Sequence, residues 1–170
     1  ASGWVLEAGS ALSGNDNTDA DPEVLVAIGD LSTSIGAADI TEVEMVTTTA
    51  DKSEGFTISV RVRYNEPVDV VTTGGTPTLA VTNGNEGTGT GRGPHSLSYA
   101  SGTGTNELIF SLAIAAANAA TNADDVLTVG AQNIALNSGT IKDASGTASD
   151  AAVAISSAQG TAAGSVTVTA

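Results

Sequence analysis

The sequence has no cysteine, few aromatic residues and no long apolar run. The lack of cysteine in 170 residues excludes a disulfide framework and any metal site built on thiolates. Aromatic residues are 3% of the chain and hydrophobic residues 41%, so a core has to be built from Val, Ile, Leu and Ala. The longest alanine-rich run, from Ala113 to Ala120, is far below the roughly 18 apolar residues of a membrane-spanning helix. The sequence therefore predicts no disulfide and no membrane-spanning helix.

Basic residues are also scarce, with 5 Lys and Arg against 19 Asp and Glu and a net charge of −14. A surface this acidic repels nucleic-acid phosphates and anionic membranes, so neither is expected as a partner. The charge is compatible with a basic protein partner, and equally with simple solubility in a salty or extracellular setting.

The usual signatures of catalysis are missing. His95 is the only histidine, and it follows Pro94 at the end of a glycine-rich stretch, where we expect a solvent-exposed loop. Nothing resembles the nucleophile elbow that a Ser-His-Asp triad needs. The loop from Gly84 to Gly93 lacks the Gly-Lys-Ser/Thr ending and the following helix of a phosphate-binding loop. We expect no enzyme activity and no cofactor.

Four aspartates are the candidates for a calcium site, although no metal is predicted. Carboxylate oxygens in loops between strands are calcium ligands, and Asp124, Asp125, Asp143 and Asp150 lie in predicted loops. The ligand spacing of an EF-hand loop is absent. Loop acids exposed to solvent are therefore the default interpretation of these residues.

From Ile40 onwards, strand signals recur every 8–12 residues, which is typical of a β-sandwich or barrel. Apolar residues alternate strictly from Phe56 to Tyr64 and again from Leu108 to Ile114, which predicts two half-buried antiparallel strands. Arg61 and Arg63 then share the exposed face and are expected to pair with acids on a neighbouring strand. Pro67 is expected to interrupt the hydrogen-bond ladder at a strand edge or switch.

The remaining strands and connections are predicted from shorter runs. Ile40, Val43 and Val46 are expected to share the first strand, with Glu42 and Glu44 facing solvent. A helical turn or wide connection is expected over 115–123 and a loop over 140–146. Further strands are predicted at 68–71, 78–82, 96–100, 126–129, 134–136, 153–155 and 165–169.

The first 39 residues differ from the rest, since they hold seven acids and no base. Two apolar islands flank a polar stretch within this segment. The islands consist of Trp4, Val5 and Leu6, and of Val24, Leu25, Val26 and Ile28. A disordered tail has little use for such islands, so we interpret the segment as an extended arm that docks on a partner. The alternative is that the islands pack on the protein's own domain.

Four sequence blocks carry a family resemblance. They are the strand 56–64 continuing into Asn65-Glu66-Pro67-Val68, the run Thr76-Pro77-Thr78-Leu79, the segment YASGTGTNELIF at 99–110, and the segment IALNSGTIKDASG at 134–146. In order and spacing, residues 40–155 resemble the immunoglobulin-like repeats of large bacterial surface proteins and marine phage structural proteins. The resemblance implies a β-sandwich used as a structural or adhesive unit. Adhesins carry such units in long tandem arrays, whereas this chain has one.

Together these features predict an all-β protein: an acidic arm over 1–39, an immunoglobulin-like antiparallel sandwich over 40–157, and a C-terminal strand or tail over 158–170. The leading hypothesis is a bacteriophage capsid decoration protein on the virion surface, which docks through its arm on the major capsid protein or on neighbouring copies of itself, as a homo-oligomer. One alternative is an adhesin or filament subunit at a bacterial cell surface. Another is a phage tail component.

Overall fold

The computed structural model describes residues 2–6, 23–28, 36–83, 94–118, 120–144 and 148–170. The chain divides into two compact units, Ala1–Ile35 and Gly36–Ala170. The described residues are mostly strands and include one short helix, so the predicted all-β class is confirmed.

The first unit contains a two-stranded antiparallel sheet made of β1 (Ser2–Leu6) and β2 (Glu23–Ile28). Trp4 lies opposite Val26, and a register shift follows, so that Val5 lies opposite Val24. The two apolar islands of the sequence therefore pair with each other, which the expectation of an extended arm did not include.

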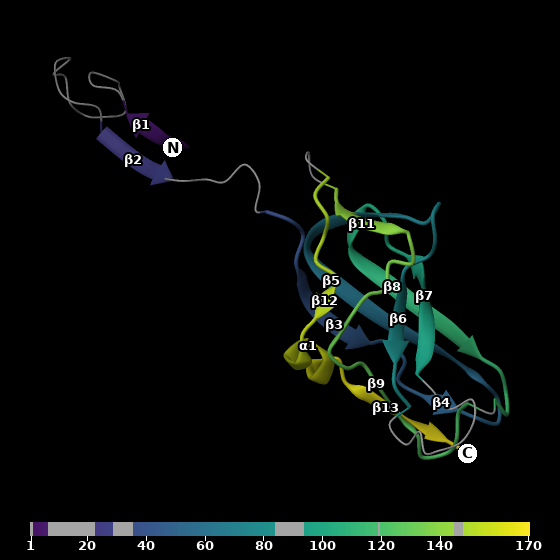
Figure 1. Ribbon diagram of the computed structural model, residues 1–170. Helices are drawn as coiled ribbons and strands as arrows, with labels where there is room; N and C mark the ends of the chain where they lie inside the picture. Colours follow the sequence, from purple (N-terminus) through teal and green to yellow (C-terminus); the bar gives the residue numbers. More distant parts are fainter. Residues whose placement is uncertain (1, 7–22, 29–35, 84–93, 119, 145–147) are drawn as a thin grey trace. The chain divides into compact units, whose positions relative to one another are not determined.

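The second unit is organised around β5 (Phe56–Val71), its longest strand (Figure 1). One side of β5 pairs with β8 (Thr105–Ile114), which continues to β7 (His95–Ser101) and β6 (Thr78–Val81), all antiparallel. The other side pairs first with β3 (Ile40–Met45) and then with β11 (Thr140–Asp143). These six strands form the main sheet.

Smaller elements complete this unit. β13 (Ser165–Thr169) lies between β4 (Ala50–Asp51), to which it is parallel, and β9 (Val126–Thr128), to which it is antiparallel. β10 (Gln132–Asn133) pairs with β12 (Ala154–Ile155). The helix α1 (Ser157–Ala162) begins at a capping box in which Ser156 and Gln159 satisfy each other's backbone N–H groups.

The core lies on one face of the main sheet. On β5 the inward positions alternate as the sequence predicts, with Ile58, Val60, Val62 and Tyr64 all buried. Phe110 of β8 lies opposite Val60 in the register. Inward residues of the smaller sheets, including Leu127, Val166 and Val168, are buried in the same hydrophobic cluster. The core is mostly aliphatic, with Tyr64 and Phe110 as its fully buried aromatic side chains, as expected from the scarcity of aromatic residues.

Three local predictions need correction. Val46 is 44% exposed, and Met45 takes the buried position, because β3 alternates from Val43 to Met45 and ends there. Residues 140–143 form β11 and not a loop, because the second half of β5 offers them a pairing edge. The strand predicted at 134–136 lies instead at β10, Gln132–Asn133, and the helix α1 was not predicted.

Pro67 does not end β5, but it marks the expected switch in pairing. The β5–β8 register breaks between Arg63 and Val68, and the other side of β5 changes from β3 to β11 over the same stretch. Because proline has no N–H to donate, an interruption in the ladder is the natural place for it.

Both ends of the second unit extend beyond the predicted domain limits. Ala38 is fully buried, and the Asp39 N–H donates to Asn65 Oδ1 at 2.8 Å, so these residues belong with the sheet and not with the arm. The C-terminal strand, expected as part of a separate tail over 158–170, is the central strand of a sheet in the same unit.

Candidate functional site

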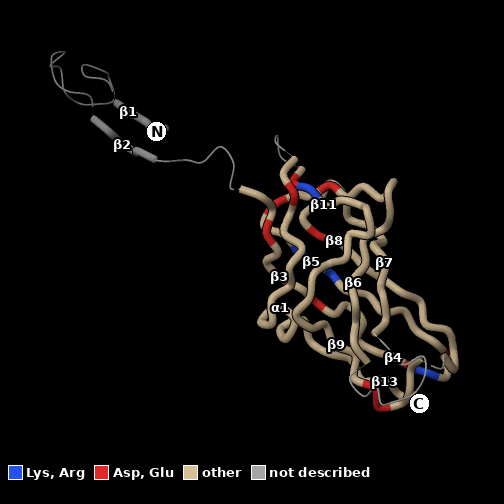
Figure 2. Tube along the Cα trace, in the orientation of Figure 1, with Lys and Arg blue, Asp and Glu red and all other residues tan. Residues whose placement is uncertain are grey.

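Charged side chains from three neighbouring strands, β3, β5 and β8, form a row on the outer face of the main sheet. Figure 2 marks the acidic and basic positions along the backbone. Arg63 binds Glu107 of β8, with 2.7 Å between Nη2 and Oε1, and also binds Glu42 of β3. Arg61 binds Glu44 of β3 and approaches Glu107 at 3.7 Å. The hydrogen bond with Glu107 is the main reason that the pKa of Arg63 is raised. The predicted pairing of both arginines is confirmed.

This charged row offers little to a partner. Both arginines are already bound to carboxylates, and all five side chains are roughly one third to one half exposed. Exposed pairs of this kind contribute little to stability and are screened by salt. The face therefore behaves as a solvated sheet surface.

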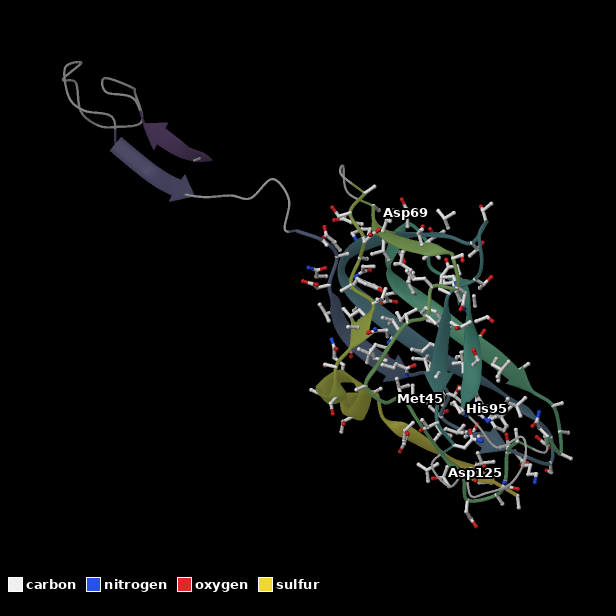
Figure 3. The ribbon with its side chains drawn as sticks, viewed as in Figure 1. Met45, Asp69, His95 and Asp125 are labelled. Atoms are coloured by element: carbon white, nitrogen blue, oxygen red, sulfur yellow. The ribbon has the colours of Figure 1, made fainter. Side chains whose placement is uncertain are left out.

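His95 is buried, contrary to the prediction of a solvent-exposed loop. It occupies an inward position of β7 opposite Val81, and only 6% of its surface is exposed. Its Nε2 lies 3.2 Å from the hydroxyl of Thr121, which is also buried. Figure 3 labels His95 and Asp125 near the same end of the unit. The glycine-rich sequence suggested a loop, but the strand alternation that includes Leu97 begins already at His95.

The four calcium candidates lie in two separate regions. Asp124 is exposed, while Asp125 is fully buried and accepts the Asn122 N–H at 2.7 Å. Asp143 is buried on β11, and Asp150 binds Lys142 at 2.9 Å. The expectation of solvent-exposed loop acids is therefore wrong for Asp125 and Asp143, because one supports a tight turn and the other lies inward on a strand. Among the described residues, no three His, Cys, Asp or Glu side chains are arranged to hold a metal ion.

Glu66 is a notable acid that the sequence analysis did not single out. Its Oε1 is buried and has no hydrogen-bond partner among the described residues. Burial raises the pKa of Glu66, and the negative charges of Asp143 and Asp39 raise it further. The signal available in the sequence was an acid beside Pro67, within a strand that continues on both sides.

A pocket of about 420 Å³ lies between the end of β9, α1 and the start of β13. Its lining consists of small residues and hydroxyls: Thr128, Val129, Gly130, Gly160, Thr161, Gly164 and Ser165. None of these side chains is a carboxylate, an imidazole or an amine. The lining therefore supplies no general acid or base.

The borders of the main sheet are covered by other segments of the same unit. The outer border of β6 is covered by three pairs: Thr78 with Ala135, Ala80 with Gln132, and Thr82 with Thr128. In the middle pair, the Gln132 side chain accepts the Ala80 N–H at 2.9 Å and donates to the Ala80 carbonyl at 2.8 Å. The side-chain amide thus takes the place of a neighbouring strand.

The opposite border is covered in the same way. On β3, Gln159 donates to the carbonyl of Ile40 at 2.7 Å, and the Met45 N–H donates to the carbonyl of Ala163 at 2.8 Å. On β11, Asp143 bonds with Ser149, and Ile141 with Ala151. Exposed sheet borders are sites where further strands add, so this coverage protects the second unit from such pairing.

The arm residues selected from the sequence all lie on the two strands of the first unit. Trp4, Val5 and Leu6 are on β1, and the residues from Val24 to Ile28 are on β2. The backbone register brings them together in one sheet. Within the described part of the chain, each of these strands pairs only with the other.

No protein-family model, curated protein or solved structure matches this chain. The resemblance to immunoglobulin-like repeats therefore stays a prediction. None of the helices in the described ranges has the length and apolar character required to cross a membrane.

Proposed function

We propose that the protein is a non-catalytic structural protein, and specifically a bacteriophage capsid decoration protein that docks on the virion through its N-terminal unit. The observation that carries the proposal is the contrast between the two units. In the second, the borders of the main sheet are covered from within, whereas the first is a small acidic unit with a two-stranded sheet of apolar sequence. One unit is suited to display and the other to attachment.

The second unit serves as the displayed knob in this proposal, and we assign it an immunoglobulin-like sandwich. A six-stranded, largely antiparallel sheet whose aliphatic core is covered by smaller sheets and a short helix supports this assignment. Its outer face is polar and internally paired, as befits a surface that stays in water.

Deleting residues 1–35 tests the attachment role. We expect the shortened protein to keep its β-sheet circular dichroism, because the core and the borders of the main sheet lie within 36–170. We expect it to stop co-sedimenting with capsid shells, because the unit proposed to attach is removed. The deletion ends before Ala38, because that side chain is part of the core. A full-length Glu107→Gln variant, altered only on the polar outer face, is the control and should bind shells normally.

Undiminished shell binding by the shortened protein would refute docking through the first unit. If the full-length protein binds no shell but assembles into filaments, the alternative of a surface filament subunit replaces the decoration role. If it binds tails only, the tail alternative replaces it.

A further inference from the structure

We propose that the β1–β2 sheet is completed by a strand from a basic protein surface, which adds to its edge through backbone hydrogen bonds. The inference rests on the proposed function and adds to it the mode of attachment and the chemistry of the partner.

The sheet of the first unit consists of β1 and β2. Two strands alone are marginally stable in water, and three or more, or a packed face, are needed for independent stability. The strand sequence of β2, EVLVAI, has successive apolar residues from Val24 to Ile28 and does not alternate. Such a sequence is typical of strands that are covered on both faces. The two-stranded sheet is therefore expected to be stabilised by a further strand or by a surface that covers its face.

The second unit is a poor site for strand addition. Both borders of its main sheet are engaged by internal hydrogen bonds, from Gln132 on one side and from Gln159 and Ala163 on the other. β4 borders the smaller sheet and has only two residues, which is short for pairing with another chain. Strand addition is thus directed to β1 or β2.

The charges of the two units indicate which kind of partner strand the β1–β2 sheet would bind. Residues 1–35 hold six of the 19 acids and none of the five bases, and residues 36–170 hold the other thirteen acids and all five bases. Both units of a second copy are therefore net negative and repel this sheet, and within its described residues both borders of the second unit's main sheet are engaged by internal hydrogen bonds. A basic strand is complementary in charge, which favours both encounter and register.

Trp4 permits a direct test on the intact protein, because it is the only tryptophan of the chain and lies in β1. The probe is a synthetic eight-residue peptide of alternating Val and Lys. Two control peptides are an alternating Val and Glu peptide, and a Val and Lys peptide of equal charge with a central Pro. We expect a saturable shift of Trp4 emission with the first peptide, weakened by salt, and loss of the shift with both controls.

Equal binding of the proline-containing peptide would show attraction by charge without strand addition, and would overturn the proposal. An absence of any shift with the Val and Lys peptide would overturn it as well. If the protein alone, without any peptide, forms a concentration-dependent dimer in sedimentation equilibrium and shows the same shift of Trp4 emission, the partner is a second copy of this chain and not a basic protein.

Two substitutions at one position separate strand pairing from side-chain chemistry. Val26, opposite Trp4 in the register, is replaced by Pro, which disrupts pairing, or by Thr, which favours strands. The Thr variant should keep the peptide response and the Pro variant should lose it, and an unchanged response in the Pro variant would contradict the inference. The two proposals can be told apart. If no peptide shifts Trp4 emission, but the full-length protein binds shells and the protein lacking residues 1–35 does not, docking through the first unit is supported and strand addition is refuted.

Discussion

Glu66 holds a carboxylate where its surroundings disfavour the charge. One oxygen is buried without a hydrogen-bond partner among the described residues, and burial together with Asp143 and Asp39 raises the pKa of the group above its ordinary value of 4.5. The folded state therefore binds this proton more tightly than the unfolded chain does. The contribution of Glu66 to stability is then unfavourable at neutral pH and disappears as the pH falls through its raised pKa.

Replacing Glu66 with Gln should stabilise the protein at pH 7, because the charge is removed from a site that disfavours it. The gain over wild type should shrink as the pH is lowered from 7 toward 4.5, since the wild-type group then becomes neutral in the folded state. Urea denaturation of both proteins at several pH values measures this difference. Glu54→Gln, at an exposed position, is the control for removing one acidic charge from the surface. A gain in Glu66→Gln that is constant with pH would contradict the argument.

Tyr64 ties β5 to the segment that precedes β12. Its ring is buried, and its hydroxyl donates to the carbonyl of Ala152 at 3.0 Å. Burial also raises the pKa of Tyr64, which keeps the hydroxyl protonated as a donor. Tyr64→Phe should lower the free energy of unfolding by about 1 kcal/mol, since a buried hydrogen bond is lost while the ring remains.

The matched control is Tyr99→Phe, measured by the same urea denaturation. The Tyr99 hydroxyl accepts the Thr103 N–H in an exposed setting, where water can replace it. A larger loss for Tyr99→Phe than for Tyr64→Phe would reverse the expected order.

His95 shows where residue-level prediction stopped. Its neighbours in sequence, Pro94 and the glycine-rich stretch, indicated a loop, whereas its burial depends on β7 pairing with β6, which lies before that stretch in the sequence. Burial of Asp125 likewise depends on a turn whose donor is Asn122. The alternation of His95 with Leu97 and the spacing of Asn122 and Asp125 were the local signals, but the pairing and the turn that bury the two residues are not visible in the sequence.

Gln132 acts at the scale of the element, because its side chain continues the ladder of β6. Replacing Gln132 with Ala removes two hydrogen bonds to Ala80 and should cost about 1–3 kcal/mol of stability. It also opens one border of the main sheet, so we expect concentration-dependent association. Urea denaturation and analytical ultracentrifugation measure the two effects.

Asn133→Ala is the matched control for this border, because the residue is exposed and adjacent in the same strand. It should leave both the stability and the association state of the parent protein unchanged. If Gln132→Ala loses stability yet shows the same association state as the parent protein at high concentration, the side chain stabilises the unit without protecting its border.

Strict alternation made β5 and β8 predictable from the sequence, and shorter runs were enough to predict β6, β7, β9 and β13, whereas β11 and α1 were missed. In β5 and β8 the period of two follows directly from one buried and one exposed face. β11 has only four residues and depends on the far half of β5 for its pairing. The helix α1 contains Gly160 and no apolar stripe, so its capping box at Ser156 was the only local indication.

At the scale of the whole molecule, the sequence indicated an acidic N-terminal segment distinct from a β-rich remainder. The boundary lies between Ile35 and Gly36, before the position suggested by the acids alone, because Ala38 and Asp39 bond with the second unit. That the two apolar islands pair in one sheet could not be predicted, since the 16 residues between Leu6 and Glu23 give no turn signal that fixes a register.

The proposed role of this chain is attachment to a viral shell. Quantitative mass spectrometry of native particles that carry it, combined with negative-stain microscopy, tests this most directly. The account predicts icosahedral capsids that contain the chain in a fixed ratio to the major shell protein. Recovery of the chain only in cell-surface filaments or tails, or free of any particle, would contradict it.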